Sequence, residues 1–213
     1  DTDGNTLWTP GKLKHVKAIG WFIEEYGVTQ VTMNITNITE TPLHLAFDET
    51  AKAANARGIR ATGSELVGLV PKSAMLEAGK YFLRKQNRST GIHESELIKI
   101  AIKSMGLDEL GPFIPEERII EYMLESGTDK KLVDLSLTDF ANETASESPA
   151  PGGGSISAYA GALGISLATM VANLSAHKRG WDERWEEFSD WADKGQILKD
   201  ELLFLVDEDT NSF

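Results

Sequence analysis

The sequence contains no cysteine among its 213 residues. This absence excludes disulfide bonds, thiolate catalysis and cysteine-ligated zinc, and nothing in the composition points to an oxidising compartment. The chain has only four histidines, and no two of them stand at the spacing of metal ligands. They are His15, His44, His93 and His177. The sequence therefore predicts no metal site.

Basic residues are also scarce. Lysine and arginine number 21 against 33 aspartates and glutamates, which gives a net charge of -12. Because binding to phosphate backbones needs a basic surface, we expect no nucleic-acid partner. The acidic excess is uneven, since residues 131–213 alone carry 6 basic and 15 acidic residues. Such a shift in charge indicates two units of different character.

The sequence shows no signal peptide, so we expect a cytoplasmic protein. Its longest apolar stretch, Ile156–Leu174, includes polar Ser157, Thr169 and Asn173 among many small residues. We interpret this stretch as a closely packed buried helix and not as a membrane span. The chain starts at Asp1 and still follows a helical pattern at its last residue, without a capping glycine or proline. We therefore expect a piece of a longer protein.

Helical and strand patterns alternate in the first 125 residues. Apolar residues recur at helical spacing from Leu13 to Tyr26, and Gly27 is suited to cap such a helix. Residues 28–34 alternate in polarity and are rich in β-branched side chains, as strands are. The remaining predictions are helices at 41–58, 71–85, 93–105 and 115–125, and short strands at 59–62 and 66–70. This order predicts an α/β unit with helices against a small sheet.

The later residues carry no strand pattern and predict an all-α unit. Its expected helices cover residues 131–145, 155–174 and the stretch from about 181 to the end. The middle helix is rich in Gly, Ala and Ser, so we expect it to lie close to another helix or a second subunit. We place the first unit at residues 1–126, a linker at 127–131 and the second unit at 132–213.

A glycine-rich break precedes the middle helix. Gly152, Gly153 and Gly154 allow a ligand to approach the backbone, and Ser155 opens a helix whose N-terminal amides favour an anion. A carboxylate or phosphate would fit there. The alternative is a packed loop between two helices. The break lacks both the lysine of a phosphate-binding P-loop and the dinucleotide fingerprint, which excludes ATPase and dehydrogenase interpretations.

Carboxylates and amides supply the other candidate site residues. Asp207 and Asp209 lie in a helical run of leucines, so at least one of them should border an apolar face and suit acid–base work. Two loops at expected strand ends carry further candidates, which are Asn34, Asn37, Ser64 and Glu65. The alternatives are a solvated charge cluster for the aspartates and turn chemistry for the loops.

Longer stretches of sequence resemble known families. Residues 16–21 (VKAIGW), 30–37 (QVTMNITN), 63–71 (GSELVGLVP) and 81–86 (YFLRKQ) resemble the C-terminal subdomain of glutamate formiminotransferase, over about residues 1–125. From Leu132 onward the chain is similar to the cyclodeaminase/cyclohydrolase family, through SPAPGGGS at 148–155 and LVDED at 205–209. The tandem order resembles the bifunctional formiminotransferase–cyclodeaminase family.

The resemblance implies a folate-dependent enzyme of histidine degradation. Such an enzyme transfers a formimino group from N-formimino-L-glutamate to tetrahydrofolate, its co-substrate. It then closes 5-formiminotetrahydrofolate to 5,10-methenyltetrahydrofolate and releases ammonia. The resemblance also implies a homo-oligomer formed through the cyclodeaminase helices. The family's transferase histidine lies in an N-terminal subdomain that these residues do not match, so the fragment alone should be inactive.

The resemblance assigns roles to the candidate residues. It implies that Gly152–Ser155 bind folate, whose glutamate tail is anionic, and that Asp207 or Asp209 is the catalytic carboxylate. Asn34, Asn37, Ser64 and Glu65 would border the transferase cleft. Two alternatives remain. One is a non-catalytic oligomerisation or folate-binding module of the same family, and the other is a transferase fused to an unrelated helical tail.

Overall fold

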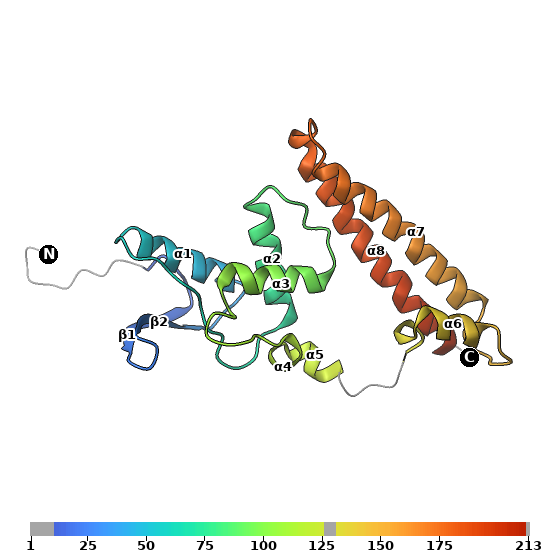
Figure 1. The fold of residues 1–213 in the computed structure, drawn as a ribbon, viewed down its shortest axis with the longest axis horizontal. Helices are drawn as coiled ribbons and strands as arrows, with labels where there is room; N and C mark the ends of the chain where they lie inside the picture. The colour runs from blue at the N-terminus through green and yellow to red at the C-terminus, as the bar shows by residue number, and fades with distance from the viewer. Residues whose placement is uncertain (1–10, 126–130, 212–213) are drawn as a thin grey trace, which may run out of the picture.

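The computed structural model describes residues 11–125 and 131–211 (Figure 1). The expected linker at 127–131 falls almost entirely outside these residues. The first part contains β1 (Val16–Ile23), β2 (Val28–Ile35), α1 (Leu43–Asn55), α2 (Lys72–Arg84), α3 (Glu94–Met105), α4 (Pro115–Arg118) and α5 (Ile120–Glu125). The second part contains the 3-10 turn η1 (Leu132–Asp134), α6 (Leu137–Thr144), α7 (Gly153–Ala176), the 3-10 turn η2 (Asp182–Arg184) and α8 (Trp185–Asn211). The fold is thus a small α/β part followed by a helical part, as predicted.

The helix predicted before Gly27 is wrong, because these residues form β1. β1 pairs antiparallel with β2 over eight residues, from Val16 opposite Ile35 to Ile23 opposite Val28. The β-branched and aromatic residues of this segment favour a strand once a partner strand is present. Gly27 has φ +63° and therefore forms the hairpin turn. α1 lies beside the hairpin, where the Thr50 hydroxyl approaches the sulfur of Met33 at 3.7 Å.

The strands predicted at 59–62 and 66–70 are also wrong. In the described chain these residues join no sheet, and only Val70 among them forms a β-bridge, which it makes with Ile119. The Val70 amide donates to the Arg118 carbonyl at 2.9 Å, and the Ile120 amide donates to the Val70 carbonyl at 3.1 Å. This bridge interrupts the helix predicted over 115–125, because Ile119 leaves the helical path and is fully buried.

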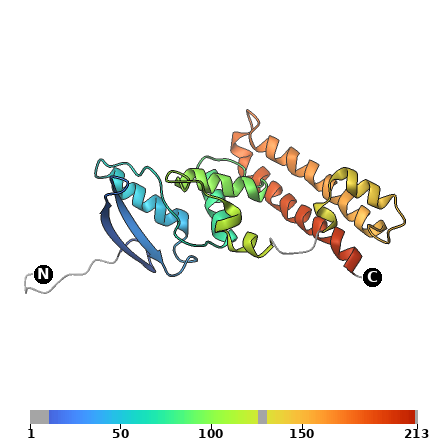
Figure 2. The ribbon, with the colours of Figure 1, turned by 60° about the horizontal axis from the view of Figure 1, so that its bottom comes forward.

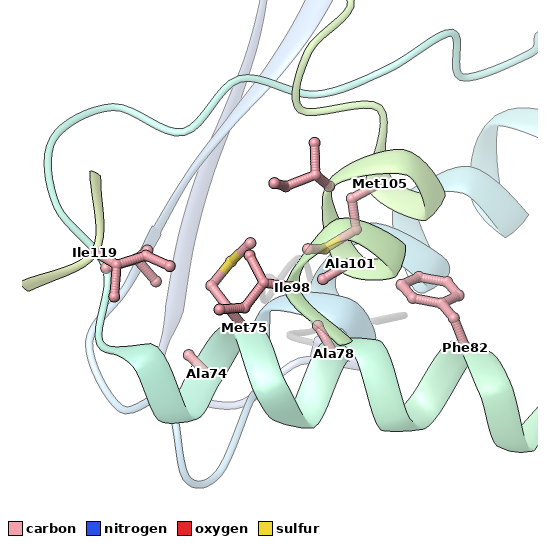
Figure 3. Close-up of a cluster of buried hydrophobic side chains, with 10 residues drawn as sticks. Ala74, Met75, Ala78, Phe82, Ile98, Ala101, Met105 and Ile119 are labelled. Atoms are coloured by element: carbon pink, nitrogen blue, oxygen red, sulfur yellow. The ribbon is translucent and has the colours of Figure 1, made fainter. Parts of the chain in front are cut away.

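The core of the first part lies between α2 and α3 (Figure 3). Met75, Ala78 and Phe82 project from α2 toward Ile98, Ala101 and Met105 of α3, and Ile119 closes one end. The helices come close because Gly79 lies against the backbone of α3. A Cβ on this residue would stand 2.2 Å from the Leu97 carbonyl oxygen.

The second part is dominated by the long antiparallel pair α7–α8 (Figures 1 and 2). Small residues face the contact, as the composition of α7 predicts. α8 runs unbroken through Gly195. A Cβ on this residue would stand 2.0 Å from the Thr169 hydroxyl oxygen, so its lack of a side chain allows the two helices to come close. The helix predicted over 131–145 is divided at Leu135, because Ser136 caps α6 by accepting a hydrogen bond from the Asp139 amide at 3.0 Å.

The expectation that α7 is buried holds for one face only. α8 covers that face, and several large apolar side chains of α7 remain exposed. They are Leu163, Leu167, Met170, Val171 and Leu174. α7 is long and apolar enough to cross a membrane by length and composition, with a mean hydropathy of 1.5 and 22% of its most apolar window buried.

Candidate functional site

The structure brings Asp209 and the glycine-rich loop together. The Asp209 Oδ2 accepts a hydrogen bond from the Ser155 amide at 2.9 Å. The Ser155 side chain is fully buried, and its hydroxyl donates to the Val206 carbonyl at 2.8 Å. Residues more than fifty positions apart therefore meet at one end of the α7–α8 pair. Sequence spacing alone did not predict this contact.

The glycines of the loop give the carboxylate its space. A Cβ on Gly154 would stand 2.1 Å from the Asp209 Oδ1, and one on Gly152 would stand 3.5 Å from Oδ2. The helix N-terminus carries exposed amides with partial positive charge, which favour an anion. Asp209 supplies that anion from within the chain. An external carboxylate at the Ser155 amide would have to displace it.

Asp207 faces a different neighbour. Its Oδ1 accepts a hydrogen bond from the Leu132 amide at 2.7 Å, which fastens η1 to α8. One turn further along α8, the Thr210 hydroxyl is buried and has no hydrogen-bond partner among the described residues. Sequence analysis did not single out Thr210, since a threonine at the polar end of a helix carries no distinctive signal. The two aspartates thus have distinct positions, one at the loop and one at η1.

The candidates of the first part are not gathered into one site. Asn37 accepts hydrogen bonds from the Thr39 and Glu40 amides at 3.0 and 3.3 Å, which is turn chemistry. The Ser64 hydroxyl donates to the Met105 carbonyl at 2.8 Å and fastens its loop to α3. Asn34 and Glu65 are exposed. Within residues 11–125, no hydrogen bond joins any two of these four residues.

The four histidines lie apart. His15 occupies the turn before β1 with φ +53°, and His93 caps α3 by accepting from the Ser95 amide at 3.3 Å. His177 follows the last turn of α7, where burial and nearby Arg88 lower the pKa of its imidazole. Over the described ranges, no group of three or more histidines and carboxylates could hold a metal ion.

A buried polar cluster between α1 and α2 was missed by sequence analysis. Asp48 is 7% exposed and accepts hydrogen bonds from the Tyr81 hydroxyl at 2.5 Å and the Lys85 ammonium at 2.9 Å. The ring of His44 stacks on Tyr81 with centroids 4.4 Å apart. Tyr81 and Lys85 are four residues apart on one helix face, and this spacing was the available signal.

The electrostatics of this cluster follow from its burial and hydrogen bonds. Burial alone would raise the pKa of Asp48, but the hydrogen bonds from Tyr81 and Lys85 outweigh it and the pKa lies below its ordinary value. The hydrogen bond to Asp48, together with burial, raises the pKa of Tyr81. Burial lowers the pKa of His44. The cluster therefore holds an ionised carboxylate, a protonated phenol and a neutral imidazole at neutral pH.

Comparison with known proteins accounts for both parts of the chain. A family model described as "Formiminotransferase domain" matches residues 2–125, and one described as "Formiminotransferase-cyclodeaminase" matches residues 136–213. The formimidoyltransferase-cyclodeaminase of Gallus gallus is 40% identical over 96% of this chain, and that of Mus musculus is 38% identical over the same share. The chain spans 38% of the length of each of these relatives.

Single-function proteins match the two parts separately. The glutamate formimidoyltransferase of Thermoplasma acidophilum is 34% identical over 43% of this chain and 30% of its own length. The methenyltetrahydrofolate cyclohydrolase of Methylorubrum extorquens is 31% identical over 37% of this chain and 38% of its own length. Because the first family model covers more than half of the residues, the chain belongs to the formiminotransferase domain family, and it continues into a segment of the formiminotransferase-cyclodeaminase family.

Proposed function

We propose that this chain is the region that joins the two activities of a bifunctional folate enzyme of histidine degradation. The transferase activity moves the formimino group of N-formimino-L-glutamate to tetrahydrofolate and releases glutamate. The cyclodeaminase activity closes 5-formiminotetrahydrofolate to 5,10-methenyltetrahydrofolate and releases ammonia. The observation that carries the proposal is the tandem order of the two family matches, with 40% identity that runs across both.

The cyclodeaminase step calls for a carboxyl group. Ring closure joins N10 of the folate to the formimino carbon, and the former imino nitrogen must gain protons before it leaves as ammonia. A positioned carboxylate that takes the proton lost by N10 and passes it to this nitrogen typically contributes about 100- to 10,000-fold in rate. Asp209 suits this role because it lies against the Gly152–Gly154 loop. Asp207 is engaged with η1 and has a structural role.

The loop contributes to folate binding beside Asp209. Its glycines allow a flat ligand to approach the backbone, and Ser155 fixes the end of α7. Since Asp209 already satisfies the Ser155 amide, we assign the loop to the reactive part of folate and not to its anionic glutamate tail. In the transferase part, we assign exposed Asn34 and Glu65 to the border of the substrate cleft. The hydrogen bonds of Asn37 and Ser64 hold the loops in which these two residues lie.

The exposed apolar face of α7 is the observation that favours a homo-oligomer. Leu163, Leu167 and Leu174 are 52%, 62% and 66% exposed, and contiguous apolar patches commonly mark protein interfaces. On neighbouring α8, exposed Asp200 and Glu201 adjoin Phe204 and Leu205, and such charges suit a protein interface better than lipid. A second copy of the chain therefore covers this face.

The test uses the full-length protein, supplied with N-formimino-L-glutamate and tetrahydrofolate. Glutamate reports the transfer, and ammonia with 5,10-methenyltetrahydrofolate reports ring closure. Asp209→Asn should lower the rate of ammonia release about 1,000-fold while glutamate is still formed. Glu186→Gln, an exposed carboxylate at the other end of the same helix, is the control. Ammonia release at the parental rate from Asp209→Asn would remove the carboxylate assignment, and a parent protein that forms neither product would remove the proposed function.

A further inference from the structure

The loop between α2 and α3 lies against the α7–α8 pair, although the sequence separates them by about a hundred residues (Figures 1 and 2). Ser89 and Thr90 at its tip are 2% and 1% exposed. These are polar side chains in a loop, which would ordinarily face water. Their burial therefore needs partners, and the helical part supplies them.

Hydrogen bonds satisfy the buried tip of the loop. The Thr90 amide donates to the Ser189 hydroxyl at 3.0 Å, and the Thr90 hydroxyl donates to the Asp193 carboxylate at 2.6 Å. Asp193 also accepts from the Lys80 ammonium at 3.2 Å, which links α2 directly to α8. Because the groups are buried and paired, a sliding movement between the parts would break several hydrogen bonds together.

The next residue of the loop is fixed by shape as well as by hydrogen bonds. The Gly91 carbonyl accepts from the Asn173 amide group on α7 at 2.7 Å and from the Gln196 amide group on α8 at 3.1 Å. A Cβ on Gly91 would stand 2.3 Å from the Ala192 Cβ and 2.4 Å from its carbonyl carbon. Only glycine allows the loop to approach α8 this closely.

We propose that residues 86–93 and the facing surface of α7 and α8 form a domain-docking site, which holds the helical part in one orientation on the transferase domain. The site lies near the C-terminal end of α7, whereas Ser155 lies at the other end. With 1.5 Å per helical residue, the distance from Asn173 to Ser155 is roughly 27 Å. The helix pair is thus a rigid arm that is anchored at one end and carries the candidate cyclodeaminase residues at the other.

The consequence for catalysis depends on the proposed function. A docked arm keeps the Asp209 site at a constant position relative to the transferase domain, so the folate product of one part meets the other part at a fixed place. The orientation of the helical part on the transferase domain is then set by the docking site as well as by the covalent connection through residues 126–130. The docking itself can be measured without any activity, so its failure and that of the proposed function are distinguishable.

The absence of cysteine permits a direct distance measurement. Lys99→Cys on α3 and Asp190→Cys on α8 introduce the only two thiols into the 213-residue chain, and both positions are exposed. Nitroxide labels on these thiols should give a single narrow distance distribution by pulsed electron paramagnetic resonance. An excess of unlabelled chain suppresses distances between copies. A broad distribution in this otherwise unchanged chain would overturn the proposal.

Two variants then test the docking residues. Gly91→Val should abolish the narrow peak because its side chain cannot fit against Ala192. Thr90→Val keeps the shape of the side chain but removes the donor to Asp193, and it should also broaden the peak. Gly111→Val is the control, since a Cβ there meets no atom within 4 Å. If Gly91→Val does not fold, as circular dichroism would show, Thr90→Val decides alone. A narrow peak that survives Thr90→Val would contradict the docking role.

Discussion

The two helix pairs of this chain are packed on opposite principles. The α2–α3 pair buries large side chains, such as Met75 and Ile98, which are 0% and 2% exposed. The α7–α8 pair buries mostly small ones, such as Ala162 and Ala192, which are 2% and 0% exposed. It leaves Leu167 on the outside at 62% exposure. The first pair is therefore stabilised from within, whereas the second keeps much of its apolar surface for another partner.

The difference follows from where each pair places its bulky residues. In α2 and α3 the bulky residues point toward the partner helix, so burial of apolar area stabilises the pair directly. In α7 the residues that point toward α8 are small, and close backbone contact replaces bulk. Leu163, Leu167 and Leu174 of α7 lie on the other face and stay more than half exposed. Removal of a bulky side chain should therefore affect the two pairs very differently.

The largest effect is expected from Met75→Ala. This change leaves a cavity in a fully buried position and should lower the free energy of unfolding by about 3 kcal/mol. The matched change on the other pair, Leu167→Ala, should alter the unfolding free energy of the isolated chain by less than about 0.5 kcal/mol. Urea unfolding at low protein concentration measures both values.

Self-association should respond in the opposite order. Leu167→Ala should weaken it, as measured by analytical ultracentrifugation, whereas Met75→Ala should leave it unchanged in the folded protein. Equal losses of stability in the two variants would show that the exposed face of α7 is covered within the chain. The contrast between the pairs would then be wrong.

Most helices could be predicted from the sequence, because their apolar spacing and caps are local properties. The predictions over 71–85, 93–105 and 155–174 correspond to α2, α3 and α7. The segment before Gly27 could not be assigned correctly from its own pattern. Its apolar residues fit a helical period as well as a strand, and only pairing with β2 decides between them. Tertiary context also replaced the strands predicted at 59–62 and 66–70 with loops.

The candidate site could be predicted only in part. The glycine-rich loop and the acidic run at 207–209 were both identified as candidates, and the structure adds that Asp209 lies at the loop while Asp207 does not. A choice between residues two positions apart depends on the rotation of α8, which no local pattern fixes. Asp48 and the Thr90–Asp193 contact depend on residues far apart in the sequence, so they could not be predicted without the fold.

The next largest effect concerns the close approach of α7 and α8. Gly195→Ala places a methyl group against Thr169 and should lower the free energy of unfolding by about 2 kcal/mol, because the helices must separate or shift. Gly164→Ala is the matched control, since a Cβ there meets nothing within 4 Å. Better helix propensity should make that variant more stable by up to about 1 kcal/mol. Thermal unfolding compares the two, and a stabilising Gly195→Ala would show that small residues are not required at this contact.

The smallest effect is expected from Asp48→Asn, which removes a buried charge from the first part of the chain. Asp48 has a pKa below its ordinary value, so its ionised form stabilises the fold at pH values above the unfolded pKa of about 3.9, and this contribution is lost as the pH falls through the folded pKa. Asp48→Asn should cost about 1 kcal/mol at neutral pH, because Asn keeps the hydrogen bond from Tyr81 but leaves Lys85 without a counterion.

The difference between the parent and Asp48→Asn should shrink as the pH falls below about 4, because the carboxylate of the unfolded parent then binds a proton, while that of the folded parent stays ionised down to its lower pKa. Urea unfolding across this range measures it, and Glu96→Gln, an exposed carboxylate paired with Lys99, is the control. Lys52 and Lys85 face Asp48 with positive charge and Tyr81 donates a hydrogen bond to it, while His44, whose burial lowers its pKa, stacks on Tyr81 in the parent and in both variants. A difference that stays constant from pH 7 to pH 3 would show that Asp48 contributes through packing and not through its charge.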